Sequence, residues 1–100
     1  IIKSDSVEGL KTLEDNSHDL IYIDAGHTYD DVKADADVAV SKAKESGILI
    51  FNDYIMFDHF IGQPYGVVQV VNDLVVSSDW RIVGFSLQQE MFCDIALRRA

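Results

Sequence analysis

The segment that decides the fold runs from Asp19 to Tyr29 and reads Asp-Leu-Ile-Tyr-Ile-Asp-Ala-Gly-His-Thr-Tyr. Its apolar run, Leu20 to Ile23, is short, rich in β-branched and aromatic residues and bounded by aspartates, which is typical of a buried parallel strand. Gly26 then allows the backbone to turn. Thr28, with Asp31 three residues later, is a candidate capping box for a helix.

Asp24 and His27 are therefore expected at the carboxyl end of this strand, on the loop that leads into the helix. In open α/β sheets this is the edge at which ligands bind. The residues also allow a simpler interpretation, in which Asp24 caps a turn and His27 is a surface histidine.

The rest of the chain alternates expected strands and helices. In order we expect the end of a strand at residues 1–2, a helix ending near residue 16, the strand at residues 20–23, a helix from Tyr29 to Glu45, a strand from Ile48 to Phe51, a helix from Val67 to Ser77, and a hairpin of strands Arg81 to Leu87 and Met91 to Leu97. Gly47 is expected to stop the second helix. This alternation predicts an α/β fold, a Rossmann-like, mainly parallel sheet with helices on both faces. The closing hairpin requires one strand to run antiparallel.

Three further features of the sequence carry expectations. The loop from Ile55 to Gly66 is unusually apolar, as expected of a lid, a pocket wall or a packing surface. Trp80 is expected to anchor the core. Cys93, the single cysteine, is expected to be a small core residue; it excludes an internal disulfide and fits a reducing, cytoplasmic setting.

Length and charge bound the function. One hundred residues predict a single domain, 1–100, and the formal net charge of −9 argues against a nucleic-acid partner. No apolar run approaches the length of a membrane span, so no membrane partner is expected. The chain opens without Met or a signal-peptide pattern, and we expect it to be part of a longer protein.

Polar residues also follow the strand that ends at Phe51, where Asn52 and Asp53 come next. In neighbouring parallel strands, Asp24 and Asp53 would lie side by side at one edge of the sheet. Two carboxylates with an amide and an imidazole nearby are suited to a hard cation such as Mg²⁺. Alternatively, these acids cap loops and face water.

The segment from Asp19 to Tyr29 resembles the fourth-strand motif of class I S-adenosylmethionine-dependent methyltransferases, in the branch with Asp-x-x-His-x-Tyr after that strand. Gly47 to Tyr54, Gly-Ile-Leu-Ile-Phe-Asn-Asp-Tyr, resembles the fifth-strand motif. The segment from Gly66 to Val71 is similar to the opening of the following helix, and the closing hairpin to the reversed last strands. The resemblance covers nearly the whole chain.

This resemblance implies roles for individual residues. Asp5 and Ser6 would lie near the adenine of the cofactor, S-adenosylmethionine. Asp24 would face the methyl-transfer centre, as a cofactor-binding and catalytic residue and as a metal ligand. Asp53 would be a second ligand, with Asn52 at a position that is often acidic in the family. His27 would be a general base or would orient the substrate.

The family's glycine-rich turn after the first strand and the acid after the second have no counterpart here. The resemblance therefore implies the carboxyl-terminal half of a methyltransferase domain, which alone would bind the cofactor weakly. The exposed sheet edge would favour a homo-oligomer.

The expected function is methyl transfer to a hydroxyl of a small molecule, with Mg²⁺ as a candidate second cofactor. A metal-dependent hydrolase and a non-catalytic α/β interaction module remain alternatives, because the residue chemistry alone supports only an α/β domain with an acidic site at strand ends.

Overall fold

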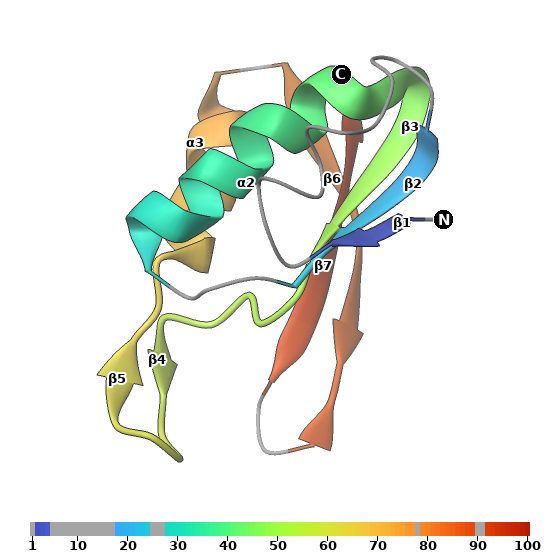
Figure 1. Cartoon of the computed structure of the whole chain (residues 1–100). Coiled ribbons are helices and arrows are strands. Elements are labelled where there is room, and N and C mark those ends of the chain that lie inside the picture. The colour runs from blue at the N-terminus through green and yellow to red at the C-terminus, as the bar shows by residue number, and fades with distance from the viewer. Residues whose placement is uncertain (1, 5–17, 25–27, 78, 90–91) are drawn as a thin grey trace.

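The computed structural model describes residues 2–4, 18–24, 28–77, 79–89 and 92–100. In that part of the chain, two helices pack on a five-stranded sheet, beside a separate two-stranded sheet (Figure 1). The large sheet contains β1 (Ile2–Ser4), β2 (His18–Ile23), β3 (Ala43–Phe51), β6 (Trp80–Leu87) and β7 (Cys93–Arg99), and the helices are α2 (Tyr29–Lys42) and α3 (Val67–Val76). The predicted α/β fold is confirmed.

The large sheet has the strand order β1-β2-β3-β7-β6. β1 and β3 both pair with β2 in parallel, whereas β7 is antiparallel to both of its neighbours, β3 and β6. Among the described strands of the large sheet, β7 is therefore the only one that runs against the rest. This confirms the expected antiparallel strand and places the start of β7 at the edge where β2 and β3 end.

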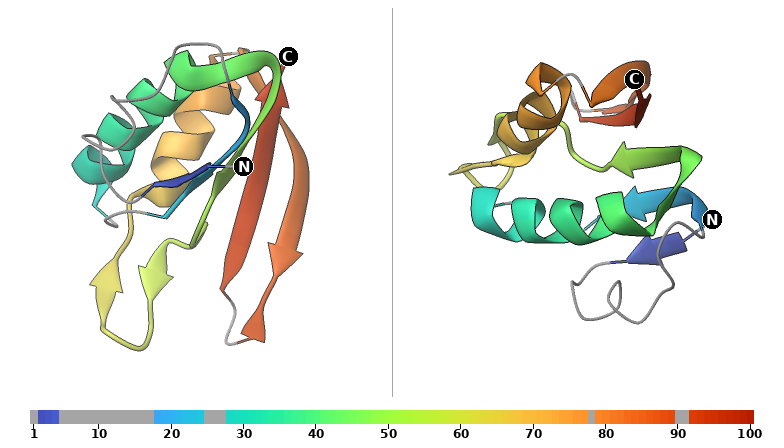
Figure 2. Two further views of the ribbon diagram at one scale, coloured as in Figure 1. Left: turned by 45° about the vertical axis from the view of Figure 1, so that its right-hand side comes forward. Right: turned by 90° about the horizontal axis from the view of Figure 1, so that it is seen from above.

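Both described helices lie on the same face of the sheet, where they contact each other (Figure 2). The expected helix that ends near residue 16 lies outside the described residues, so the expectation of helices on both faces is not tested. The shared face of the two described helices follows from the strand order, because the chain moves from β2 to β3 and then past β7 to β6 in one direction. Right-handed crossovers that advance in one direction put their helices on one face.

The side chains of the central strands differ between the two faces. On the face covered by the helices, Ile21, Leu49, Phe51, Ile95 and Leu97 are fully buried. Their neighbours on the opposite face, here called the open face, are only half-buried, although several are apolar. The expectation that these strands are buried on both faces therefore holds for one face only, because no described helix covers the other.

Helix α2 begins as expected and ends early. The Thr28 hydroxyl accepts a hydrogen bond from the backbone N–H of Asp31 at 3.2 Å, which confirms one half of the predicted capping box. The helix ends at Lys42 rather than Glu45, because Ala43 is already extended and begins β3.

Gly47 therefore lies within β3 instead of stopping the helix. A β-carbon at this position would lie 3.0 Å from the carbonyl oxygens of His18 and Lys44. The close approach of these backbone segments therefore favours glycine at position 47. From sequence alone, such a glycine cannot be told from one that ends a helix.

The other predicted elements that fall on described residues are present with small shifts. The helix expected from Val67 to Ser77 is α3, and the closing hairpin consists of β6 and β7. Trp80 is buried as expected, and so is Cys93. The expected loop from Ile55 to Gly66 instead contains a short hairpin, β4 (Phe57–Asp58) and β5 (Gln63–Pro64).

Candidate functional site

Three strands meet at the carboxyl edge of the sheet and deliver its polar residues. β2 and β3 end together, with Ile23 paired to Phe51, so that Asp24 and Asn52 follow as neighbours. The backbone N–H of Asn52 donates to the Ile23 carbonyl at 2.9 Å, which continues the pairing past the strand ends. On the other side, Phe51 pairs with Ile95 of β7, which brings Asp94 beside Asn52.

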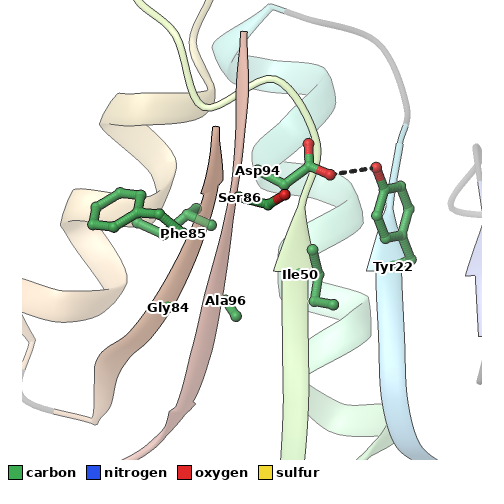
Figure 3. Close-up of a pocket in the computed structure, with 8 residues that line it drawn as sticks. Tyr22, Ile50, Gly84, Phe85, Ser86, Asp94 and Ala96 are labelled. Carbon is green, nitrogen blue, oxygen red and sulfur yellow. Dashed lines mark hydrogen bonds between the residues drawn. The ribbon is translucent and has the colours of Figure 1, made fainter. Parts of the chain in front are cut away.

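A hydrogen-bond network joins these side chains. The Asn52 amide nitrogen, Nδ2, donates to Asp24 Oδ1 at 2.8 Å. The Tyr22 hydroxyl lies 2.8 Å from Asp94 Oδ2 and 3.0 Å from Asn52 Oδ1. Figure 3 shows the Tyr22 ring on β2 pointing across β3 toward Asp94. Asn52 is therefore the centre of the network, with a carboxylate on one side and a phenol on the other.

Asp53 occupies an unusual backbone position at this edge. Its φ of 55° lies in the left-handed region, which costs about 1 kcal/mol or more for a residue with a β-carbon. Its N–H points to Asp94 Oδ1, at a long 3.4 Å. Burial raises the pKa of Asp53, and the nearby charges of three other aspartates, chiefly Asp24, raise the same pKa further.

The pKa of Tyr22 is also raised. Burial is the largest cause, and the hydrogen bond to Asp94 and the charge of that carboxylate follow. The phenol therefore keeps its proton at neutral pH and acts as a donor within the network.

A shallow groove on the open face continues this site. Its volume is about 240 Å³, and it is lined by Tyr22, Ile50, Gly84, Phe85, Ser86, Asp94, Ile95 and Ala96 (Figure 3). One row of paired residues crosses the strands along this groove: Tyr22 of β2 pairs with Ile50 of β3, Ile50 with Ala96 of β7, and Ala96 with Gly84 of β6. The groove arises because this row changes from large side chains on β2 and β3 to small ones on β7 and β6.

The β4–β5 hairpin extends beyond the same edge of the sheet (Figure 1). Asp58 holds it together: its carboxylate accepts hydrogen bonds from Tyr65 Oη at 2.7 Å and from the backbone N–H groups of Phe60 and Ile61. At the tip, the Phe60 ring is parallel to the Phe92 ring at 5.9 Å. Exposed apolar side chains on this hairpin fit the expected pocket wall or packing surface.

The sequence prediction brought together the correct strand ends. Asp24, Asn52 and Asp53 lie at one edge, although the hydrogen bond runs from Asn52 to Asp24 rather than directly between two acids. The other predicted site residues, His27, Asp5 and Ser6, lie outside the described residues.

Sequence reasoning missed Asp94 and Tyr22. Tyr22 was read as part of an apolar strand, and Asp94 as the fourth residue of a strand beginning at Met91. The available signal was the reversed direction of the last strand, because such a strand starts at the edge where parallel strands end.

Within the described residues, no three His, Cys, Asp or Glu side chains are grouped as metal ligands. A cation at this edge would therefore need the Asn52 amide oxygen as well as carboxylates. The donor chemistry of Asp24, Asn52 and Asp53 suits a hard cation, since all three offer oxygen.

A family model described as a methyltransferase domain matches residues 1–54, more than half of the chain. The chain belongs to this methyltransferase family. The match confirms the resemblance to class I S-adenosylmethionine-dependent methyltransferases and favours it over the hydrolase and the interaction module.

Two relatives of this methyltransferase-family chain can be described. An uncharacterized protein, y4gI, of Sinorhizobium fredii (strain NBRC 101917 / NGR234) is 32% identical over 62 residues, which are 62% of this chain and 7% of that protein. An O-methyltransferase from Bacillus cereus, crystallised in complex with SAH, has a similar fold, with a TM-score of 0.63 at 12% identity. That similarity covers 93% of this chain and 46% of the solved chain, so this chain spans less than half of either relative.

The described helices do not combine the length and the apolar character that a membrane span requires.

Proposed function

We propose that this chain supplies part of an S-adenosylmethionine-dependent methyltransferase that transfers a methyl group to a hydroxyl of a small molecule. The observation that carries the proposal is the meeting of Asp24, Asn52 and Asp53 at the carboxyl edge of the sheet. Family membership supports the reaction type, and the O-methyltransferase fold supports an oxygen acceptor. The coverage of 46% of that solved chain supports a role as one portion of a larger domain.

The reaction is a displacement at carbon. When bound, S-adenosylmethionine supplies an electrophilic methyl group on a sulfonium. The acceptor oxygen forms a bond to the methyl carbon while the carbon–sulfur bond breaks and its electron pair goes to sulfur. The hydroxyl proton leaves to a base, for which His27 is our candidate. Much of the rate would come from holding the two reactants in line.

Asp24 is our candidate for orienting the acceptor. Its carboxylate is fixed by the amide of Asn52, and Asn52 is itself held by backbone pairing to β2. A carboxylate fixed in this way can accept a hydrogen bond from a hydroxyl and direct its oxygen, without needing to move during the reaction.

Asp24, Asn52 and Asp53 are also the residues that would hold Mg²⁺. A cation there would lower the pKa of the acceptor hydroxyl and help orient it. The raised pKa of Asp53 supports this proposal, because its largest charge-related cause is the neighbouring Asp24. A divalent cation would offset that repulsion.

The test is methyl transfer from isotopically labelled S-adenosylmethionine to a panel of small hydroxyl compounds, using the longest natural protein that contains this chain. Asp24→Asn should reduce kcat by about 100-fold, the scale of a misplaced reactant. Asp37→Asn is the control, since Asp37 is an exposed residue on α2 that is paired only with Lys33 at the surface in the described contacts. Full activity in Asp24→Asn would contradict the proposed role.

Calorimetric titration separates binding from chemistry. The longer protein should bind S-adenosylmethionine, and the 100-residue chain should bind it more weakly. Equal affinity would contradict the proposal that this chain is one portion of the cofactor site. Loss of activity on chelation, restored by Mg²⁺, would support the metal, whereas unchanged activity would remove it from the mechanism and leave the methyltransferase proposal intact.

A further inference from the structure

The hydrogen bonds around Asn52 need more protons than the Tyr22 hydroxyl can supply. The Tyr22 hydroxyl has one proton, yet it lies within hydrogen-bonding distance of two acceptors, Asn52 Oδ1 at 3.0 Å and Asp94 Oδ2 at 2.8 Å. The Asp94 carboxylate is the stronger acceptor, since it is charged and closer. When the phenol donates to Asp94, two oxygens, Tyr22 Oη and Asn52 Oδ1, face each other without a proton between them.

A half-turn of the Asn52 amide about its last side-chain bond removes this conflict. The half-turn exchanges the amide oxygen and nitrogen at nearly the same positions. Nδ2 would then donate to Tyr22 Oη, and the phenol would donate to Asp94. On the other side, Oδ1 would replace Nδ2 beside Asp24 Oδ1, where the present separation of the two atoms is 2.8 Å. Two oxygens at this distance repel each other unless a cation lies against both.

The two orientations of the amide therefore suit different occupants of the site. With Nδ2 toward Asp24, the amide satisfies the carboxylate and leaves the contact with Tyr22 unfavourable. With Oδ1 toward Asp24, the network from Asn52 through Tyr22 to Asp94 is fully satisfied. The second orientation presents an amide oxygen next to a carboxylate, which is the donor arrangement that a hard divalent cation binds.

We propose that Asp94, acting through Tyr22, is a positioning residue that turns the Asn52 amide oxygen toward Asp24 and so strengthens the binding of a divalent cation. The proposal rests on the cation site of the proposed function, but it concerns binding of the metal and does not depend on methyl transfer. The Asp94 carboxylate also accepts hydrogen bonds from Gln88 Nε2 at 3.2 Å and from the Asp53 N–H at 3.4 Å. These two hydrogen bonds help to hold the carboxylate in place.

Asp94→Asn is the decisive variant because it preserves shape and reverses the direction of the hydrogen bonds. Its amide oxygen can keep the contact with the Asp53 N–H, while its nitrogen donates to Tyr22 Oη. The phenol would then donate to Asn52 Oδ1 and hold the amide in the orientation that suits no cation. Tyr22→Phe removes the relay without reversing it.

The experiment titrates the 100-residue chain with Mn²⁺, followed by electron paramagnetic resonance, and with Mg²⁺, followed by calorimetry. Asp94→Asn should weaken Mn²⁺ binding by about tenfold or more, the usual effect of losing a residue that orients a metal ligand, and Tyr22→Phe should weaken it less. Asp37→Asn removes the same charge from the exposed face of α2 and should leave the affinity within about twofold, since exposed charges at a distance are screened.

A spectroscopic measurement separates positioning from a general loss of structure. In ¹H–¹⁵N spectra, Mg²⁺ should shift the side-chain amide signals of Asn52 in the unmodified chain, and should shift them much less in Asp94→Asn at equal occupancy of the metal. Absence of Mn²⁺ binding by the unmodified chain would overturn the inference, and so would equal affinity of Asp94→Asn and the unmodified chain. Neither result would contradict the proposed methyl transfer, which is measured separately with S-adenosylmethionine.

Discussion

Gly66 lies directly against the start of α2, and we predict that replacing it with alanine destabilises the fold. Gly66 is the N-cap of α3, and Tyr29 is the first residue of α2. A β-carbon at Gly66 would overlap the backbone N and Cα atoms of Tyr29 and would lie 2.7 Å from its Cβ. Because backbone atoms cannot rotate away, the helices would have to separate.

The magnitude follows from two opposing effects. The φ of Gly66 is −94°, which alanine adopts freely, so the loss of flexibility in the unfolded chain alone would stabilise by about 0.4–1 kcal/mol. Overpacking costs about 1–3 kcal/mol, and overlap with backbone belongs at the upper end of that range. We therefore expect a net loss of about 2 kcal/mol in the free energy of unfolding, combining these two estimates.

Gly84→Ala is the matched control. A β-carbon at Gly84, in β6, would meet no atom within 4 Å. Alanine should therefore stabilise this strand position by about 0.5–1 kcal/mol. The two substitutions are chemically identical and are predicted to have opposite signs.

Urea unfolding followed by the fluorescence of Trp80, the single tryptophan, measures both variants. For a chain of this size, a loss of about 2 kcal/mol lowers the midpoint by about 2 M urea. A Gly66→Ala protein as stable as the unmodified chain would refute the close approach of α2 and α3. Destabilisation by Gly84→Ala to the same extent would show that a general effect of alanine, and not overlap with Tyr29, explains the result.

Three further predictions concern stability. The hydrogen bond from Tyr65, with those from two backbone N–H groups, lowers the pKa of Asp58. The stabilisation from the Asp58 carboxylate should be complete above the ordinary carboxyl pKa of 3.8 and lost as pH falls below that value. Asp58→Asn should therefore flatten the acid limb of a plot of urea midpoint against pH. Arg99→Met should lower the free energy of unfolding, measured by thermal unfolding, by about 2 kcal/mol. Arg99 donates hydrogen bonds to carbonyls at the end of α2 and stacks on Trp80, with its guanidinium carbon 4.6 Å from the ring centre. Leu97→Ala should cost about 3 kcal/mol in urea unfolding, since Leu97 is fully buried; a loss below about 1 kcal/mol would contradict its place in the core.

The sequence alone predicted which elements form and where the site lies, because those features depend on local patterns. A short apolar run ending in Asp24 is sufficient to indicate a strand and its polar edge. The valine-rich segment of α3 was assigned correctly from helical spacing against its β propensity. Its buried residues Val67, Val70 and Val71 share one side of the helix, as that spacing requires.

The features that the sequence did not predict depend on contacts between distant residues. Gly47 is read as a helix stop until the approach of His18 is known. The face on which each helix packs depends on the strand order, which local periodicity does not contain. Asp94 joins the site only because β7 lies between β3 and β6 in the reverse direction, so that a residue 41 positions beyond Asp53 becomes its neighbour.

The carboxyl edge is also where local and global preferences disagree. Asp53 combines a left-handed backbone conformation with a carboxyl group whose pKa is raised by burial and by like charges. Each of these features costs folding free energy, and a chain selected only for stability would replace them. Conflict of this kind is expected where residues are kept for binding or chemistry. A cation bound at this edge should therefore stabilise the folded chain, because it would offset the repulsion between Asp53 and the neighbouring aspartates.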